Sequence, residues 1–584
     1  MINPRKIKNS AILFPVLFFL FNSLLLGLAP VGSSSEAREG QVVHVILSGG
    51  DWLFPLRNGI SPSKPPLFHW IGAMLWPLTG FDQEFAIRIP SLIFAAVILY
   101  LVSLLTVTLS SAPEGSHNSA HLVVAGVLAT TYGFLRMALD SRVDMVFTGL
   151  LVCGLYVVLS PIFHTPERGV SISWLRKQIF ALLIAASVLA KGPLGVVLAA
   201  VIIFAVTLWL FDLTRALKFC LSFISTLPLF LLITLPYYYH AAQLGPDLVG
   251  ESVVTRQIFL ENIQRFIGGS VIDPKPVWFY VPSVLRTAFP WSILFVIFLT
   301  KDVRRAFRRV KNGLEAFPHS ERKDMLGAVW FLVGFIFFSI SAGKRHSYML
   351  PLYPGMALYV GIRLSQVLES SNSTRDAMLR KAKGKSWVLM FVLAISALFT
   401  FEIAQKPLVF GKIDFEVARN WIKDQALLLE TLIVLLLGGL VWFASRFSVL
   451  KNVERFAGML VLIVGMLGIF ISLGQGVKNR LKNFEGIALQ VRAVVPESMP
   501  LYTIKSKNDE FFDPYFFYVD REVIIKSPDF DSFPKGAYVL AYTDWLREKQ
   551  NDLHLRPIRL VTRFNQFPAM RLGSTERELV LFQN

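Results

Sequence analysis

Long apolar segments alternate with short polar ones along most of this chain. After an apolar segment at 11–30 and a polar one at 31–85, the chain stays largely apolar to about residue 476. An apolar run of about 20 residues is long enough to cross a membrane as a helix. The pattern predicts about 13 transmembrane helices, at 11–30, 86–108, 122–139, 143–162, 179–190, 193–211, 218–238, 282–300, 325–342, 347–364, 386–404, 426–445 and 455–473.

The polar segment after the first apolar run contains a further helical pattern. Apolar side chains recur at helical spacing over 36–48, which indicates a helix lying along the membrane surface with its charged first turn facing inward. Farther on, the chain reads Lys64-Pro65-Pro66. Two prolines stiffen the backbone, so they should hold Lys64 at the start of the next apolar helix.

The last part of the chain has a different pattern, with short strand-like runs between two helical ones near 485–495 and 543–550. The strand-like runs are Leu501–Ile504, Val523–Ile525, Ala537–Ala541 and Leu579–Phe582. We therefore expect an all-α polytopic membrane domain over 1–476 and a small α/β domain over 477–584. Two roles stay open for the second domain: a passive cover, or a part in holding substrate.

Composition supports a membrane protein. The chain is 54% hydrophobic and only 17% charged, with a mean hydropathy of +0.54. Its net charge of +18 forms no basic stripe with interleaved aromatic residues, which argues against nucleic-acid binding. Cys153 and Cys220 lie in apolar segments, with no disulfide framework or zinc spacing.

The basic residues predict an orientation in the membrane. They concentrate in alternate loops, such as 301–311 and 375–385, and basic loops mark the cytoplasmic side. The N-terminus is therefore expected in the cytoplasm, and an odd number of helices places 477–584 outside a cytoplasmic (inner) membrane. A cleaved signal peptide is the alternative for 11–30. The alternation of basic and non-basic loops along the chain fits only if this helix stays in the mature protein.

This orientation gathers the chemically interesting residues on the outer face, in loops 31–85 and 239–281 and in three short turns. The cations are Arg38, Lys64, Lys191, Arg265 and Lys344, the carboxylates are Glu36, Asp140, Asp144 and Glu261, and His346 and Tyr348 complete the rim. Rigidly held cations bind phosphate well, so the set suits a reaction on a phosphate-bearing lipid.

Structural roles remain open for single residues: Lys64 could reach lipid headgroups, and Asp144 could cap the helix that it begins. No sequence feature requires a metal, and a divalent ion stays open.

The outer segments carry motifs in a characteristic order. They are Glu36-Ala-Arg38, Gly50-Asp-Trp-Leu-Phe-Pro, Lys64-Pro-Pro-Leu-Phe-His-Trp, Arg88-Ile-Pro-Ser, Val143-Asp144-Met, Ala190-Lys-Gly-Pro-Leu-Gly, Glu261 to Phe266, Pro276-Val-Trp-Phe-Tyr, Phe289-Pro-Trp and Tyr348-Met-Leu-Pro. Over about residues 10–360 the chain resembles the integral-membrane glycosyltransferases of the GT-C fold. The resemblance is to their bacterial branch with the aminoarabinose (lipid A) transferase, which is related to protein O-mannosyltransferases.

The resemblance implies sugar transfer from a polyprenyl-phosphate donor of the undecaprenyl type to a lipid (lipid A-like) or protein acceptor. Arg38, Lys64 and Arg265 would neutralise the leaving phosphate, and Glu36 and Asp144 would orient or deprotonate the acceptor.

Two positions depart from the family pattern. Ser35 stands where the family has Asp, and Ser63 stands where it often has Glu before the lysine. The first change leaves Glu36 or Asp144 as the base, or indicates a changed acceptor or reduced activity.

Two alternatives of other classes stay open. A lipid-linked sugar flippase or transporter shares many spans and a cationic pocket, although the chain lacks the internal repeat that is common in transporters. A catalytically silent homologue that binds polyprenyl phosphate would explain Ser35.

Overall fold

The computed structural model describes most of the chain. The described residues are 4–79, 82–109, 120–164, 172–247, 250, 252–268, 274–370, 452–504, 513–519, 521–526, 533–542, 559–565 and 578–583, with 430, 431, 434, 438 and 439. In these residues five helices are long and apolar enough to cross a membrane, or up to seven if each of two bent helix pairs is one span. Segment 386–404 and most of 426–445, both expected as helices, lie outside the described residues.

The helices before residue 250 follow the expected apolar segments, with different ends. They are α1 (Pro4–Ser23), α2 (Ser34–Leu47), α3 (Leu67–Leu75), η1 (Trp76–Thr79), α4 (Gln83–Leu109), α5 (Ala120–Ala129), α6 (Tyr132–Ala138), α7 (Val143–His164), α8 (Trp174–Lys191), α9 (Leu194–Leu210), α10 (Leu213–Leu221), η3 (Ser222–Thr226) and α11 (Leu227–Gln243). The first helix thus ends at Ser23, earlier than the expected residue 30.

The later helices include one π-helix, η4, in the long loop after α11. They are η4 (Thr255–Gln264), α12 (Arg265–Ile267), η5 (Val277–Phe279), α13 (Tyr280–Thr287), α14 (Trp291–Lys311), α15 (His319–Arg322), η6 (Lys323–Met325), α16 (Leu326–Ile340), η7 (His346–Leu352), α17 (Tyr353–Ser370), α21 (Asn452–Lys482), α22 (Phe484–Val494) and α23 (Asp513–Val519).

Two segments expected as single helices are bent. The segment 122–139 forms α5 and α6, which meet at 72°. At this bend Thr130 and Thr131 donate their hydroxyls to the carbonyls of Gly126 and Val127, which competes with a continuing helix.

The segment 282–300 forms α13 and α14, at 114°. Here Pro290 precedes α14 and has no N–H to continue the helix before it.

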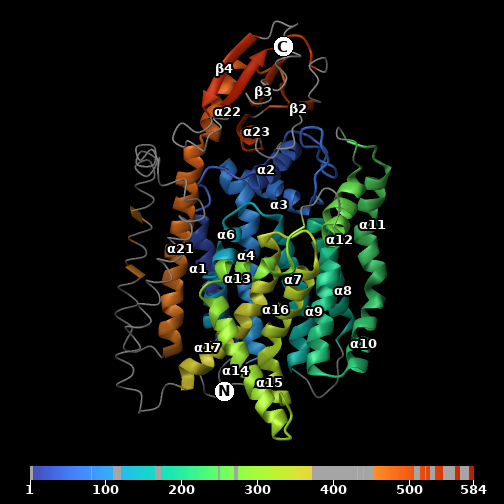
Figure 1. Cartoon of the computed structure of the whole chain (residues 1–584), viewed down its shortest axis with the longest axis vertical. Helices are drawn as coiled ribbons and strands as arrows, with labels where there is room; N and C mark the ends of the chain where they lie inside the picture. The colour runs from blue at the N-terminus through green and yellow to red at the C-terminus, as the bar shows by residue number, and fades with distance from the viewer. Residues whose placement is uncertain are drawn as a thin grey trace.

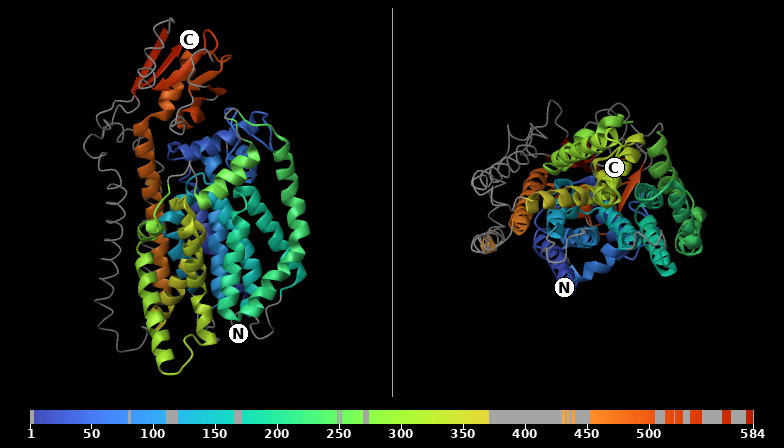
Figure 2. Two further views of the ribbon diagram at one scale, coloured as in Figure 1. Left: turned by 45° about the vertical axis from the view of Figure 1, so that its right-hand side comes forward. Right: turned by 90° about the horizontal axis from the view of Figure 1, so that it is seen from below.

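The helices form an elongated bundle with a small sheet at one end (Figures 1 and 2). The sheet has the order β2-β1-β3-β5-β4 and consists of β1 (Leu501–Ile504), β2 (Val523–Lys526), β3 (Tyr538–Tyr542), β4 (Arg559–Asn565) and β5 (Glu578–Gln583). Strand β1 pairs in parallel with β2 and β3, whereas β5 pairs antiparallel with β3 and β4. Four of these strands were expected from sequence, and β4 was not.

Helix α2 lies between the bundle and the sheet. It packs on α3 on one side and on α23 on the other, within a hydrophobic core that also includes residues of the sheet. Polar contacts fix this arrangement: the Tyr518 hydroxyl accepts from the Val31 N–H at 2.6 Å and donates to Glu84 at 2.7 Å, and Arg57 pairs with buried Asp513. The C-terminal unit therefore holds the helix that carries Glu36 and Arg38.

Candidate functional site

A small cavity of about 90 Å³, here called the charged pocket, lies among the ends of several helices. Its lining residues are Ser35, Arg38, Glu39, Ser63, Lys64, Ser141, Arg142, Val143, Asp144, Lys191, Glu261, Arg265 and Arg345. These residues come from α2, the loop before α3, the turn into α7, the end of α8, the loop around η4 and the turn before η7. The structure thus brings together Arg38, Lys64, Asp144, Lys191 and Arg265, all singled out from sequence.

Helix α2 supplies one wall of the charged pocket. The Ser33 side chain caps the helix by accepting from the Glu36 N–H at 3.2 Å. Ser35, Arg38 and Glu39 follow at the i, i+3 and i+4 spacing, which places them on one face. The helix expected over 36–48 is thus present, and one of its faces turns into the pocket.

The second wall is an ion-pair cluster centred on Glu261. Its Oε2 accepts from Lys64 Nζ at 2.5 Å, and its Oε1 accepts from Arg265 Nη2 at 2.7 Å. Burial alone would raise the pKa of Glu261, but Lys64 and Arg265 lower it to about 2. Arg265 also donates to the Tyr348 hydroxyl at 3.2 Å. Glu261, in η4, therefore supplies the carboxylate that pairs with Lys64.

Lys191 and Asp144 form the third wall and are ion-paired. Lys191 ends α8, and Gly192 follows with a φ of +91°, a conformation that glycine adopts easily. The ammonium group of Lys191 lies 5.0 Å from the ring centre of Phe147 and 5.1 Å from that of Tyr348. Asp144 lies in the first turn of α7, where a carboxylate also suits the helix N-terminus. Asp144 therefore suits the helix N-terminus by its charge as well as pairing with Lys191, but it lies inside the first turn and not at the N-cap.

Glu36, expected as a catalytic carboxylate, does not line the charged pocket. It is 3% exposed, and its Oε1 accepts from Arg88 Nε at 2.6 Å and from the Ser141 N–H at 3.4 Å. Burial and the nearby Asp140 raise the pKa of Glu36 to about 7, against the effect of Arg88. Since α2 turns this side chain away from the pocket, the expectation that it contacts the acceptor does not match its position.

Three other expected residues lie beside the charged pocket or in a different one. Asp140 pairs with Arg142 at 2.8 Å and is buried. Lys344 is 8% exposed and donates to the carbonyls of Ser341 and Lys275, so Arg345, its neighbour, lines the pocket instead. His346 lines a second cavity.

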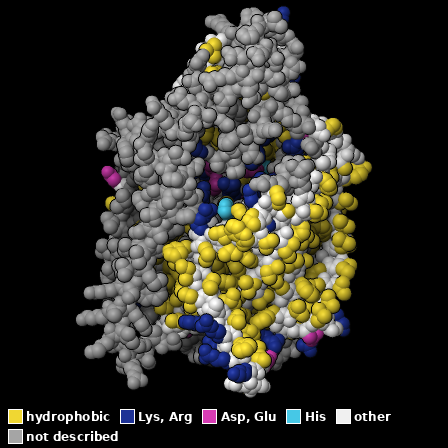
Figure 3. All heavy atoms as spheres, in the orientation of Figure 1, with side chains coloured by type: hydrophobic (Ala, Val, Ile, Leu, Met, Phe, Trp, Pro, Cys, Tyr) yellow, Lys and Arg dark blue, Asp and Glu magenta, His cyan; other side chains and the backbone are white. Residues whose placement is uncertain are grey.

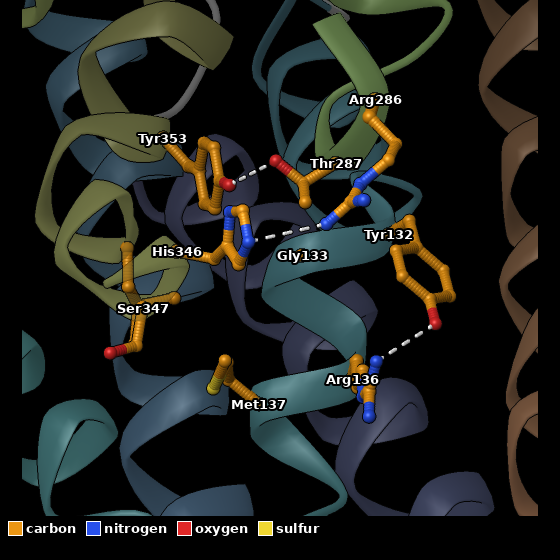
Figure 4. Close-up of a pocket in the computed structure, with 10 residues that line it drawn as sticks. Tyr132, Gly133, Arg136, Met137, Arg286, Thr287, His346, Ser347 and Tyr353 are labelled. Carbon is orange, nitrogen blue, oxygen red and sulfur yellow. Dashed lines mark hydrogen bonds between the residues drawn. The ribbon is translucent and has the colours of Figure 1, made fainter. Parts of the chain in front are cut away.

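This second cavity, here called the arginine pocket, has a volume of about 350 Å³. It is lined by Tyr132, Gly133, Arg136, Met137, Arg286, Thr287, His346, Ser347, Leu350 and Tyr353. Figure 4 shows Arg136 from α6 and Arg286 from α13 on the side of the cavity facing His346.

The surroundings of His346 favour the neutral form of its imidazole. Ser283 Oγ lies 2.7 Å from its Nδ1, and Arg286 Nη2 donates to its Nε2 at 3.5 Å. Burial, and then Arg286 and Arg136, lower the pKa of His346. No carboxylate is among the described residues that line the arginine pocket, so its charge suits an anion.

The charged residues of both pockets lie close to a broad hydrophobic surface of the kind that faces lipid. In Figure 3 Lys, Arg and acidic side chains, with a histidine, gather in a hollow above a broad hydrophobic belt. Other Lys and Arg side chains gather at the lower end, where α14 ends in Arg308, Arg309 and Lys311. The hollow therefore lies at the end of the bundle that carries the sheet.

Sequence reasoning missed two residues here, Glu39 and His69. Glu39 lines the charged pocket, and buried His69 contacts it through its Nε2 at 2.7 Å. Arg142 and Arg345 also line the pocket, and both stand in the charged turns that the sequence singles out. The pairing of Glu39 with His69 had no signal in the sequence.

In the residues that the structure describes, no group of three or more His, Cys, Asp or Glu side chains could hold a metal ion.

No model of a known protein family matches the chain. An undecaprenyl phosphate-alpha-4-amino-4-deoxy-L-arabinose arabinosyl transferase of Shewanella sediminis is 24% identical over 408 residues, which is 68% of this chain and 67% of the relative. The second such transferase of Proteus mirabilis is 25% identical over 61% of this chain and 60% of its own length. An uncharacterized protein of Aquifex aeolicus is 28% identical over 69% of this chain and 72% of its own length.

The fold matches solved structures over almost the whole chain. The crystal structure of ArnT from Cupriavidus metallidurans bound to undecaprenyl phosphate has a TM-score of 0.70 at 17% identity, with 98% of both chains covered. Its apo state has a TM-score of 0.68 at 16% identity and the same coverage. The chain is therefore a homologue of the undecaprenyl phosphate-aminoarabinose arabinosyl transferases and has the GT-C fold of ArnT.

Proposed function

We propose that this chain is a membrane glycosyltransferase that moves a sugar from an undecaprenyl phosphate-type donor to an acceptor outside the cytoplasmic membrane. The observation that carries the proposal is the charged pocket, where six Lys or Arg and three Asp or Glu side chains from separate segments converge. Preorganised cations stabilise the charge that develops on a departing phosphate. The named activity of the relatives points the same way.

The reaction is a displacement at the anomeric carbon of the sugar. The bond from that carbon to the phosphate oxygen breaks, the bond to the acceptor oxygen forms, and polyprenyl phosphate leaves. Arg38, Lys64 and Arg265 neutralise the charge that grows on the phosphate, and Lys191 and Arg345 line the same pocket. Asp144 orients the acceptor, and Glu36 keeps Arg88 and the turn at Ser141 in place.

The arginine pocket is the proposed place for the polar part of the acceptor. Residue 345 lines the charged pocket and residue 346 lines the arginine pocket, so the two cavities lie on either side of the start of η7. Two arginines without a lining carboxylate favour a phosphate-bearing lipid, lipid A-like, over a neutral protein hydroxyl. The tyrosines and Met137 in the wall suit the apolar part of such a molecule.

The purified protein in lipid nanodiscs tests this function. We expect it to convert undecaprenyl phosphate-aminoarabinose and lipid A to glycosylated lipid, detected by mass spectrometry with released undecaprenyl phosphate. Transbilayer movement of the donor without a covalent product would instead support a flippase. Donor binding with neither result would support a silent homologue.

The orientation is proposed from the charges. Thirteen spans, basic loops such as 301–311 inside, and an extracytoplasmic unit over 477–584 give a cytoplasmic N-terminus. We expect a reporter that is active only outside the cytoplasm to work when fused after Asn584. Activity of a cytoplasm-only reporter at the same position would contradict the orientation.

Lys64 provides a test of the phosphate contacts. Lys64→Ala is expected to weaken donor binding by at least ~1.5 kcal/mol, on the scale of charge-assisted contacts. Titration calorimetry or the KM of the donor would measure the change. Lys535→Ala, at an exposed position, is the matched control, and equal donor affinity in both variants would remove Lys64 from the site.

A further inference from the structure

Glu39 differs from the other carboxylates of the charged pocket. Asp144 is ion-paired with Lys191, and both oxygens of Glu261 are engaged by Lys64 and Arg265. In the described part of the chain, the hydrogen-bond partner of the Glu39 side chain is an imidazole: its Oε2 lies 2.7 Å from His69 Nε2. Its second oxygen, Oε1, therefore keeps its capacity to accept a proton.

Among the described residues, the contact with Glu39 is the hydrogen bond that His69 makes through its side chain. It lies in α3 and is 1% exposed, and its Nδ1 is buried without a hydrogen-bond partner among the described residues. A proton on Nδ1 would leave a buried donor unsatisfied, so the neutral ring carries its proton on Nε2 and donates it to Glu39. His69 thereby holds Glu39 Oε2 in a side chain that lines the charged pocket, while Oε1 has no hydrogen-bond partner among the described residues.

The surroundings keep Glu39 ionised. Burial alone would raise its pKa, but His69, through its hydrogen bond and through its charge when protonated, and then the charges of Arg38 and Lys64 bring the pKa below its ordinary value. The carboxylate is thus in its basic form at neutral pH, beside the cations that would hold the donor phosphate.

We infer that Glu39 is the catalytic base of the transfer and that His69 is its positioning residue, an inference that rests on the proposed function. As the acceptor oxygen bonds to the anomeric carbon, its proton passes to Glu39 Oε1, while the polyprenyl phosphate takes the electron pair of the broken bond. The proton then leaves to water. Glu39 thus has the role that was expected for Glu36. Glu36 cannot fill this role because it is buried, is bonded to Arg88 and does not line the charged pocket.

The first test replaces the carboxylate by its amide. Glu39→Gln is expected to lower kcat by about 10²–10⁴-fold, the usual range for general-base assistance, and to change the donor KM by no more than about threefold. The control is Asp51→Asn, an exposed residue of the same outer loop that caps Leu53, and it should leave kcat unchanged. Ser35 lines the same pocket one helical turn earlier, so Ser35→Asp in the Glu39→Gln background should restore part of the rate.

The second test uses pH to separate positioning from folding. The rate falls as pH drops through the pKa of the base, so the acid limb of the wild-type kcat profile should lie below the ordinary range of a glutamate. In His69→Phe the hydrogen bond is lost while burial remains, and the acid limb should move to higher pH. His69→Gln keeps an N–H donor and should keep the wild-type profile.

Each outcome decides the inference. A Glu39→Gln variant with kcat within threefold of wild type would overturn it, whether another group is the base or the acceptor arrives deprotonated. An unmoved acid limb in folded His69→Phe would remove His69 from its role. If wild-type protein transferred no sugar to any acceptor, the proposed function would fail first, before any comparison of the variants.

Discussion

Replacement of Asp144 by Asn is expected to lower the rate of sugar transfer by at least about 10²-fold. The carboxylate pairs with Lys191 in the charged pocket. An amide of the same shape would leave Lys191 without its counter-charge and would orient the acceptor oxygen less well. Single-turnover kinetics with saturating donor would measure the effect on the chemical step.

The capping interpretation of Asp144 gives the opposite result, because Asn also caps helices well. Asp212 serves as a matched control: it caps α10, away from the charged pocket, by accepting from the Arg215 N–H at 2.9 Å. We expect Asp212→Asn to keep full activity. Full activity in Asp144→Asn as well would assign Asp144 a capping role alone.

Replacement of Arg88 by Met is expected to lower the free energy of unfolding by about 3–5 kcal/mol, the usual cost of leaving a buried charge unpaired. Arg88 is 1% exposed in α4. Its guanidinium donates to Glu36 and to the carbonyls of Leu26 and Ala29 at 2.5–2.6 Å. The change would therefore remove the counter-charge of Glu36, which would keep only the long contact from the Ser141 N–H, and the arginine donor to two carbonyls. Thermal unfolding in detergent would measure the loss.

The pH dependence of this loss has a definite sign. The pKa of Glu36 is already raised to about 7 by burial, and it should rise further without Arg88. A carboxyl with a raised pKa in the folded state destabilises that state as pH rises above its ordinary value near 4.5. Arg88→Met should therefore be less destabilised at pH 5 than at pH 8, and a second change, Glu36→Gln, should recover part of the stability. If Arg88→Met lost the same free energy of unfolding at pH 5 and at pH 8, the unpaired charge of Glu36 would not be the cause of the loss.

Much of the charged pocket could be predicted from sequence because its cations stand at the ends of apolar segments. Lys64 and Lys191 each occur at an end of a hydrophobic run, Arg265 lies in the long loop 239–281, and the alternation of loops places all three on one face. Segments that end on one face of a bundle bring such residues close together. This inference needs no knowledge of how the helices pack.

The orientation of α2 could not be predicted in the same way. Glu36 and Arg38 are both charged and near the helix start, and helical periodicity does not say which of them faces the pocket. That choice depends on Arg88, a buried arginine in a transmembrane helix far along the chain, which fixes Glu36 on the opposite side. The contact between Glu39 and His69 likewise depends on how α2 packs on α3, which neither segment encodes alone.

The break between α5 and α6 shows a third limit. The run of apolar residues over 122–139 is continuous, so hydropathy predicts one helix. The interruption comes from two hydroxyl groups, those of Thr130 and Thr131, that bond to helix carbonyls. The break turns α6 toward the arginine pocket, where Tyr132 and Arg136 contribute to the lining.

The excess of cations in the charged pocket affects what happens after transfer. A donor phosphodiester carries one negative charge, whereas the released polyprenyl phosphate is a monoester with a charge of about −1.5 to −2 at neutral pH. Six Lys or Arg side chains against three Asp or Glu side chains therefore attract the product more strongly than the donor. Under the proposed reaction, product inhibition is a direct consequence of the pocket that stabilises the leaving group. Turnover in the membrane would then depend on how quickly polyprenyl phosphate is taken away from the enzyme.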